Sequence, residues 1–68
     1  MDETIKKLKE ENEELLKKIM SLSKTLEEPD GISGLQVLLM KQQLNVMKEY
    51  SHILDRRTRD LYRKKEGK

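Results

Sequence analysis

The chain is divided by residues 28–34, which read EPDGISG. Pro29 has no backbone N–H to donate and its ring crowds the preceding turn, so a helix cannot run through it. Gly31, two residues further on, is typical of a turn. Both flanking segments are long, highly charged and rich in regularly spaced Leu and Ile, which predicts amphipathic helices. We therefore expect a helix over residues 1–27, a turn over 28–33, a second helix over 34–65 and a tail over 66–68.

The first helix carries apolar residues at alternating steps of three and four. A stripe this narrow is typical of a coiled-coil seam. Ile at a positions with Leu at d positions favours a parallel two-stranded coiled coil. Asn12 falls at an a position, where a buried amide fixes register and oligomeric state by pairing with its symmetry mate. The first seam consists of Ile5, Leu8, Asn12, Leu15, Ile19, Leu22 and Leu26.

Residues 11–19, which read ENEELLKKI, resemble the leucine zippers of dimeric transcription factors. A zipper of that family also carries one Asn at an a position and an EELL run. The resemblance covers residues 1–26 and implies parallel dimerisation. It does not imply transcription, because the basic DNA-reading region of such factors should precede the zipper. Two interpretations stay open: a natural zipper of plain composition, or an engineered dimeriser over residues 1–19 joined to native sequence that begins near Met20.

The second helix has its own start signal. Ser33 is a candidate N-cap, and Gln36, three residues later, completes a capping box. Ile32 and Val37 flank this cap at the spacing of a hydrophobic staple. After Gly34 the segment contains no Pro and no further Gly before Gly67. At ~1.5 Å per residue, it predicts a helix roughly 48 Å long.

The second helix also has a wider apolar face than the first. One heptad seam runs along it, and a row of three apolar residues spaced seven apart lies beside that seam. Since consecutive residues step by ~100°, the two rows together are wider than a two-stranded contact. We therefore expect this helix to lie in an oligomeric helical bundle. The second seam consists of Val37, Met40, Leu44, Met47, Ser51, Leu54, Thr58 and Leu61. The side row consists of Leu39, Val46 and Ile53, accompanied by Leu35 and Tyr50.

The partner of the wide face stays open at this point. The second helix either joins a bundle with its symmetry mates, meets a second zipper dimer antiparallel to give a tetramer, or offers its face to a different helical protein. It can also fold back on the first helix. We expect a fold-back to be the less favoured arrangement, because the outer face of the first helix is rich in Glu and Lys and offers little to the side row.

Charge is distributed unevenly along the chain. Residues 1–34 contain six basic and nine acidic side chains, whereas residues 35–68 contain nine basic and four acidic ones. Many of the basic residues gather at the end of the second helix. This indicates either a solvated helix end with i,i+4 ion pairs, such as Asp55 with Arg59, or a contact for an acidic partner. The basic end consists of Arg56, Arg57, Arg59, Arg63, Lys64 and Lys65.

Motifs for catalysis and metal binding are weak. Glu49 and His52 have the Glu-x-x-His spacing of di-metal four-helix bundles, but helical stepping places both away from the apolar face. The GISG stretch at residues 31–34 fits a turn better than an RNA-binding loop, which requires a sheet. The chain contains no Cys and one His, so thiolate metal sites are excluded and a catalytic triad is unsupported. We expect no enzymatic activity and no cofactor.

Together these patterns predict an all-α chain that acts as an oligomerisation and scaffold module. We expect a homodimer or higher homo-oligomer that mediates helix–helix contacts and binds a helical protein partner. The alternative is a dimeric module that presents its basic end to nucleic acid or another acidic surface. The longest apolar stretch, residues 37–40, is far shorter than the ~20 residues that span a bilayer, and the start resembles no signal peptide. We therefore expect an intracellular protein, either cytoplasmic or nuclear.

Overall fold

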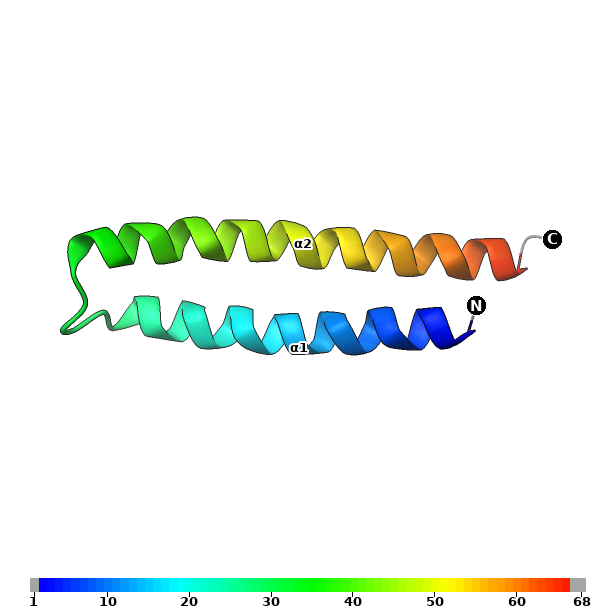
Figure 1. The fold of residues 1–68 in the computed structure, drawn as a ribbon, viewed down its shortest axis with the longest axis horizontal. Helices are drawn as coiled ribbons and strands as arrows, with labels where there is room; N and C mark the ends of the chain where they lie inside the picture. Colours follow the sequence, from blue (N-terminus) through cyan, green and yellow to red (C-terminus); the bar gives the residue numbers. More distant parts are fainter. Residues whose placement is uncertain (1, 67–68) are drawn as a thin grey trace.

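The computed structural model describes the chain from residue 2 to residue 66, with side chains from residue 3 to residue 64. This part of the chain forms two α-helices, α1 (Asp2–Glu27) and α2 (Gly34–Glu66). They pack antiparallel as a hairpin, with the turn at one end and the start of α1 and the end of α2 at the other (Figure 1). The Cα extents are 54 × 15 × 13 Å, so the hairpin is a thin rod. The predicted all-α fold with two long helices is confirmed.

The expectation that a fold-back is the less favoured arrangement is wrong. In the structure, α1 lies along α2 of the same chain (Figure 1). The first seam of α1 packs against the second seam of α2. The outer, charged face of α1 therefore does not contact the side row. The face of residues 1–26 that a parallel zipper partner would cover is thus occupied by α2. A heptad stripe needs an apolar helix opposite it, and an antiparallel neighbour in the same chain meets that need.

The core lies along the line where the two seams meet. Leu8, Leu15, Ile19 and Leu54 form one buried cluster, and Leu44, Met47 and Leu61 pack against it with part of their surface exposed. Ile5 is buried as well, near the start of α1. Fully burying one such side chain contributes about 1.5–3 kcal/mol. The core is therefore narrow, as expected for a chain of this length with only two helices to bury one another.

The turn follows from the residues that interrupt the helical pattern. The carbonyl of Thr25 accepts a hydrogen bond from the N–H of Glu28 at 3.3 Å as α1 ends. The carbonyl of Pro29 then accepts one from the N–H of Ile32 at 3.2 Å. Gly31 adopts a φ of 79°, a left-handed conformation that costs little only when there is no Cβ. These contacts reverse the chain within six residues.

Ser33 lies at the N-terminus of α2 and satisfies its first free N–H groups. Its Oγ accepts a hydrogen bond from the backbone N–H of Gln36 at 3.2 Å. Its carbonyl accepts the first helical bond, from the N–H of Val37 at 3.0 Å. This is the geometry of an N-cap. α2 continues to Glu66, one residue beyond the end expected from the sequence.

Candidate protein interaction surface

α2 has two apolar faces, one buried against α1 and one exposed to solvent. The face towards α1 is the second seam, of which Leu54 has no exposed surface and the other members are half-buried. The side row is exposed: Leu39 retains 45%, Val46 67% and Ile53 52% of its accessible surface. One helix in a two-helix fold has only one neighbour, so its second apolar face stays in water.

The side row belongs to a longer exposed strip. Leu35 is exposed at the start of α2, and Tyr50 is exposed between Val46 and Ile53. From Leu35 to Ile53 the strip runs about 27 Å along the helix, at 1.5 Å per residue. Several large apolar side chains exposed along one side of a helix are typical of an interaction surface. The strip is the strongest candidate for a functional site in the described part of the chain.

Leu38 was missing from the faces predicted from the sequence, although it is 54% exposed. It lies about 80° around α2 from Val46, on the side away from the second seam, and follows Leu35 by three residues, one helical turn away. That i,i+3 spacing was the available signal. Leu38 therefore broadens the exposed apolar surface at the beginning of α2.

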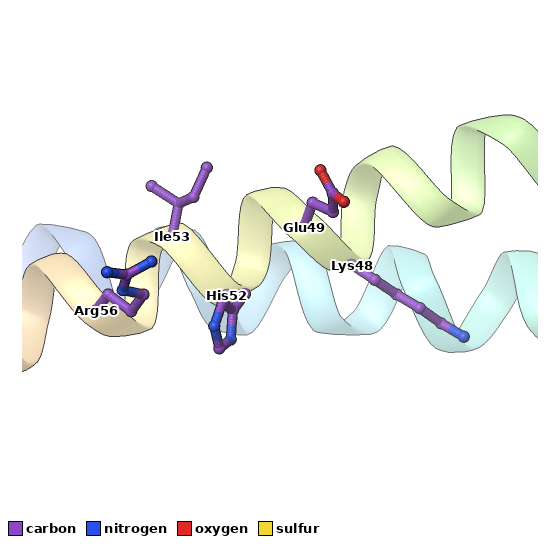
Figure 2. A pocket seen from close by; sticks show the side chains of 5 residues that line it. All are labelled: Lys48, Glu49, His52, Ile53 and Arg56. Carbon is purple, nitrogen blue, oxygen red and sulfur yellow. The ribbon is translucent and has the colours of Figure 1, made fainter.

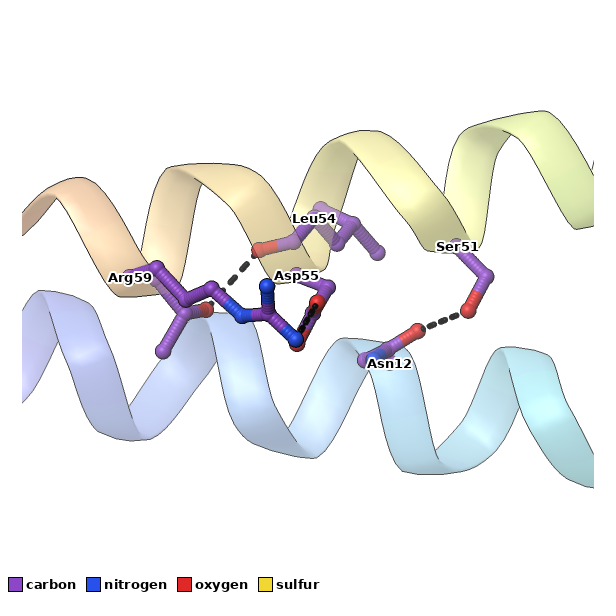
Figure 3. A network of polar contacts seen from close by, with 6 residues as sticks. Asn12, Ser51, Leu54, Asp55 and Arg59 are labelled. Carbon is purple, nitrogen blue, oxygen red and sulfur yellow. Dashed lines mark hydrogen bonds and ion pairs between the residues drawn. The ribbon is translucent and has the colours of Figure 1, made fainter.

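A polar pair interrupts the core and fixes how the helices are aligned. Ser51 Oγ donates a hydrogen bond to Asn12 Oδ1 at 2.6 Å across the two helices, and both side chains are half-buried (Figure 3). The sequence argument gave Asn12 a second Asn as its partner, whereas in the hairpin its partner is Ser51. Sliding α1 along α2 by one turn would leave both groups without this bond, which is costly when polar groups are partly buried. The pair therefore selects one register.

A second polar contact joins the helices along the edge that carries the side row. The Tyr50 hydroxyl donates a hydrogen bond to Glu11 Oε2. This bond, together with partial desolvation and the negative charge of Glu11, raises the pKa of the Tyr50 phenol above its usual 10.0. Because the hydroxyl is tied to α1, the Tyr50 ring lies at the border between the hairpin contact and the side row.

The surface of α2 around His52 is mostly charged. A surface depression of about 480 Å³ is lined by Lys48, Glu49, His52, Ile53 and Arg56, all from α2 (Figure 2). Figure 2 shows the Glu49 and Ile53 side chains on one side of α2 and those of Lys48 and His52 on the other. Within residues 3–64, no three His, Asp or Glu side chains gather closely enough to hold a metal ion. The depression thus has charged side chains but no enclosing wall from α1.

The basic end carries local ion pairs. Arg59 contacts Asp55 at 3.1 Å and Lys64 contacts Asp60 at 3.6 Å, each pair one turn apart on α2 and largely exposed. Exposed pairs of this kind contribute at most about 1 kcal/mol. Arg56, Arg57 and Arg63 form no ion pair within the described residues. The side chain of Lys65 lies outside the described ones, and a role of the basic end in binding an acidic surface stays a prediction.

Tyr62 is the aromatic side chain of the basic end. The Lys9 ammonium lies 4.9 Å from the centre of its ring, so α1 contributes a cation–π contact near the open end of the hairpin. Sequence spacing gave no indication of this contact, because it depends on the antiparallel alignment. It adds a further link between the helices beyond the buried core.

No helix within residues 2–66 has a stretch that is both long and apolar enough to cross a membrane.

Comparison with known proteins places the hairpin in a family. The Sequestin family model matches residues 2–60, which include α1, the turn and most of α2. No curated protein and no solved structure matches the chain, and nothing identifies residues 1–26 as a leucine zipper. The chain belongs to the Sequestin family.

Proposed function

We propose that this chain is a helical-hairpin module for protein–protein interaction, in which the side row of α2 docks against a helix of its partner. The observation that carries the proposal is the exposure of Leu39, Val46 and Ile53 on a helix whose other apolar face is already occupied by α1. Their seven-residue spacing suits a partner helix that lies nearly parallel to the α2 axis.

The hairpin supports such docking because it holds the side row straight and in place. α2 runs unbroken from Gly34 to Glu66, and α1 is fixed against it by the core and by the Asn12–Ser51 bond. A preformed surface loses little conformational entropy when it binds, so more of the energy of apolar burial is retained as affinity. Each fully buried side chain of the row would contribute about 1.5–3 kcal/mol before those costs.

We propose binding without catalysis. The side chains at the surface that carries the proposal are aliphatic, and they supply no acid, base or nucleophile. The basic end is a weaker candidate for the main contact, because two of its members are already engaged by Asp55 and Asp60 on the same helix.

The test compares two charged substitutions at adjacent positions. Val46→Glu places a carboxylate in the middle of the side row, where docking would have to remove it from water at a cost of several kcal/mol. Asn45→Glu adds the same charge about 100° away around the helix, at a site that is also exposed. Both positions face solvent in the hairpin, so helicity and thermal stability of the isolated chain should change little.

Tagged wild-type and variant chains are expressed at equal levels, and bound chains are captured and identified by mass spectrometry, with untagged copies of this chain counted among them. Wild type and Asn45→Glu should retain the same partner, and Val46→Glu should lose it. Identical partners in all three samples would show that the side row is not the docking surface.

A further inference from the structure

We propose that the helix covering the side row is α2 of a second copy of this chain, packed antiparallel with a two-fold axis at Val46. This inference rests on the proposed function and names its partner. It places two hairpins side by side through their α2 helices, with each α1 on the outside.

The side row is complementary to a second copy of itself. Leu39 and Ile53 each lie seven residues from Val46, about 10 Å along the helix in opposite directions. Rotation about an axis at Val46 therefore sets Leu39 of each copy against Ile53 of the other, and the two Val46 side chains against one another. A two-fold interface requires this kind of self-matching patch.

The distribution of charge along the hairpin favours the antiparallel direction. Arg57 lies 11 residues after Val46, about 16 Å along α2, and follows Ile53 by one turn on the same face. Gly34 lies 12 residues before Val46, about 18 Å in the other direction. The two-fold rotation thus brings the basic end of one copy beside the turn of the other.

That turn is acidic. Glu28 and Asp30 lie in it, Glu27 directly precedes it, and all three side chains are exposed. Arg57, which has no ion pair within the described hairpin, would face them across the interface. In a parallel pair, the two basic ends would lie side by side and repel each other, as would the two acidic turns. Apolar spacing alone permits both directions, and charge favours one.

The pairing also explains why the apolar face of α2 is wide. In the hairpin alone, α2 buries the second seam and leaves the side row in water. With a second copy on the side row, α2 has a helical neighbour on each of its apolar faces, as a central helix of a bundle does. A narrow two-helix core also gains burial that it does not reach by itself.

Single cysteines test both the partner and its direction, because the wild-type chain has none. Val46→Cys, Leu39→Cys and Ile53→Cys are prepared separately in the full chain, with Asn45→Cys as the control on another face. Each is oxidised gently at a concentration where sedimentation shows the wild type to be assembled, and cross-linked dimer is measured on a non-reducing gel. Circular dichroism of the reduced samples checks that each variant remains helical.

The proposal predicts efficient cross-linking of Val46→Cys alone. Leu39→Cys alone and Ile53→Cys alone should not cross-link, because like positions lie about 21 Å apart in the antiparallel pair and a disulfide needs Cα atoms within roughly 7 Å. A mixture of Leu39→Cys with Ile53→Cys should cross-link as efficiently as Val46→Cys, and Asn45→Cys should not.

Three results would overturn the proposal. Cross-linking of all three side-row variants alone would show a parallel pair. Equal cross-linking of Asn45→Cys would show random collision. A wild type that sediments as a monomer at every accessible concentration would show that the second copy is not the partner. In that last case the proposed function still stands if Val46→Glu loses a different protein in the capture experiment.

Discussion

Leu54 and Ile53 are adjacent in the chain but differ in burial. Leu54, on the second seam, has no exposed surface, whereas Ile53, on the side row, keeps 52% of its surface in water. Both belong to apolar heptad rows on the same helix. The fold uses one of these rows to hold the hairpin together and leaves the other free. The hairpin therefore forms with only one apolar face of α2 covered, and the other face remains available for a partner.

The largest effect should come from truncating the inner of these two neighbours. Leu54→Ala leaves a cavity in the centre of the core and should lower the free energy of unfolding by about 2–5 kcal/mol. Ile53→Ala removes a similar aliphatic group from an exposed position and should have little effect on the isolated hairpin. Chemical denaturation at low protein concentration measures both. Equal losses for the two variants would abolish the distinction between the faces.

A smaller effect is expected at the start of α2, which serves both faces equally. Ser33→Ala removes the Oγ that accepts the Gln36 N–H bond and should cost about 0.5–2 kcal/mol, the range for N-caps. Ser33→Asp keeps an acceptor at the same place and should retain most of the stability. If thermal melts do not separate Ala from Asp at this position, the helix does not depend on this cap.

The polar pair in the core distinguishes the hairpin from a parallel zipper. Ser51→Ala leaves Asn12 half-buried without its partner and should cost about 1 kcal/mol, typical for one hydrogen bond. Adding Asn12→Leu should recover that loss, since replacing both partners by apolar groups removes the unsatisfied amide. The coupling between the two sites is read from a double-mutant cycle of unfolding free energies. Strict additivity would mean that the two side chains do not meet.

The smallest effect should arise at the edge between the two faces. The hydrogen bond to Glu11 raises the pKa of Tyr50 in the folded chain above 10.0, so the folded state favours the neutral phenol. This contribution to stability is fully present below pH 10 and is lost as pH rises through the higher, folded pKa. Tyr50→Phe should therefore flatten part of the alkaline fall in melting temperature, and Glu11→Gln should do the same. An unchanged alkaline profile in both variants would count against the contact.

Local structure followed from the sequence because its causes are local. Pro29, Gly31 and Ser33 fix the turn and the start of α2, and heptad spacing fixes which side chains share a face. The separation of the side row from the second seam also followed from spacing, since its three apolar residues lie too far around α2 to join that seam.

The partner of the first seam did not follow from the sequence, because a heptad stripe calls for an apolar helix without saying whose. An Asn at an a position can pair with a second Asn12, as in a zipper, or with Ser51, as it does in the hairpin. The six-residue turn favours the hairpin over a zipper dimer, since it holds α2 beside α1 at a high effective concentration. The Tyr50–Glu11 and Lys9–Tyr62 contacts depend on that alignment and carry no spacing signal of their own.

Closure of each chain on itself as an antiparallel hairpin can be tested by one intramolecular distance. Glu3 and Asp60 are exposed, and each lies nine residues from the Asn12–Ser51 contact, towards the open end. Spin labels are placed at Glu3→Cys and Asp60→Cys, and the doubly labelled chain is diluted with excess unlabelled chain so that only distances within one molecule are measured. The hairpin predicts a narrow distribution at about 10–20 Å, since packed helix axes lie about 8–10 Å apart. A distribution centred beyond ~50 Å, as two separated helices of these lengths would give, would contradict it.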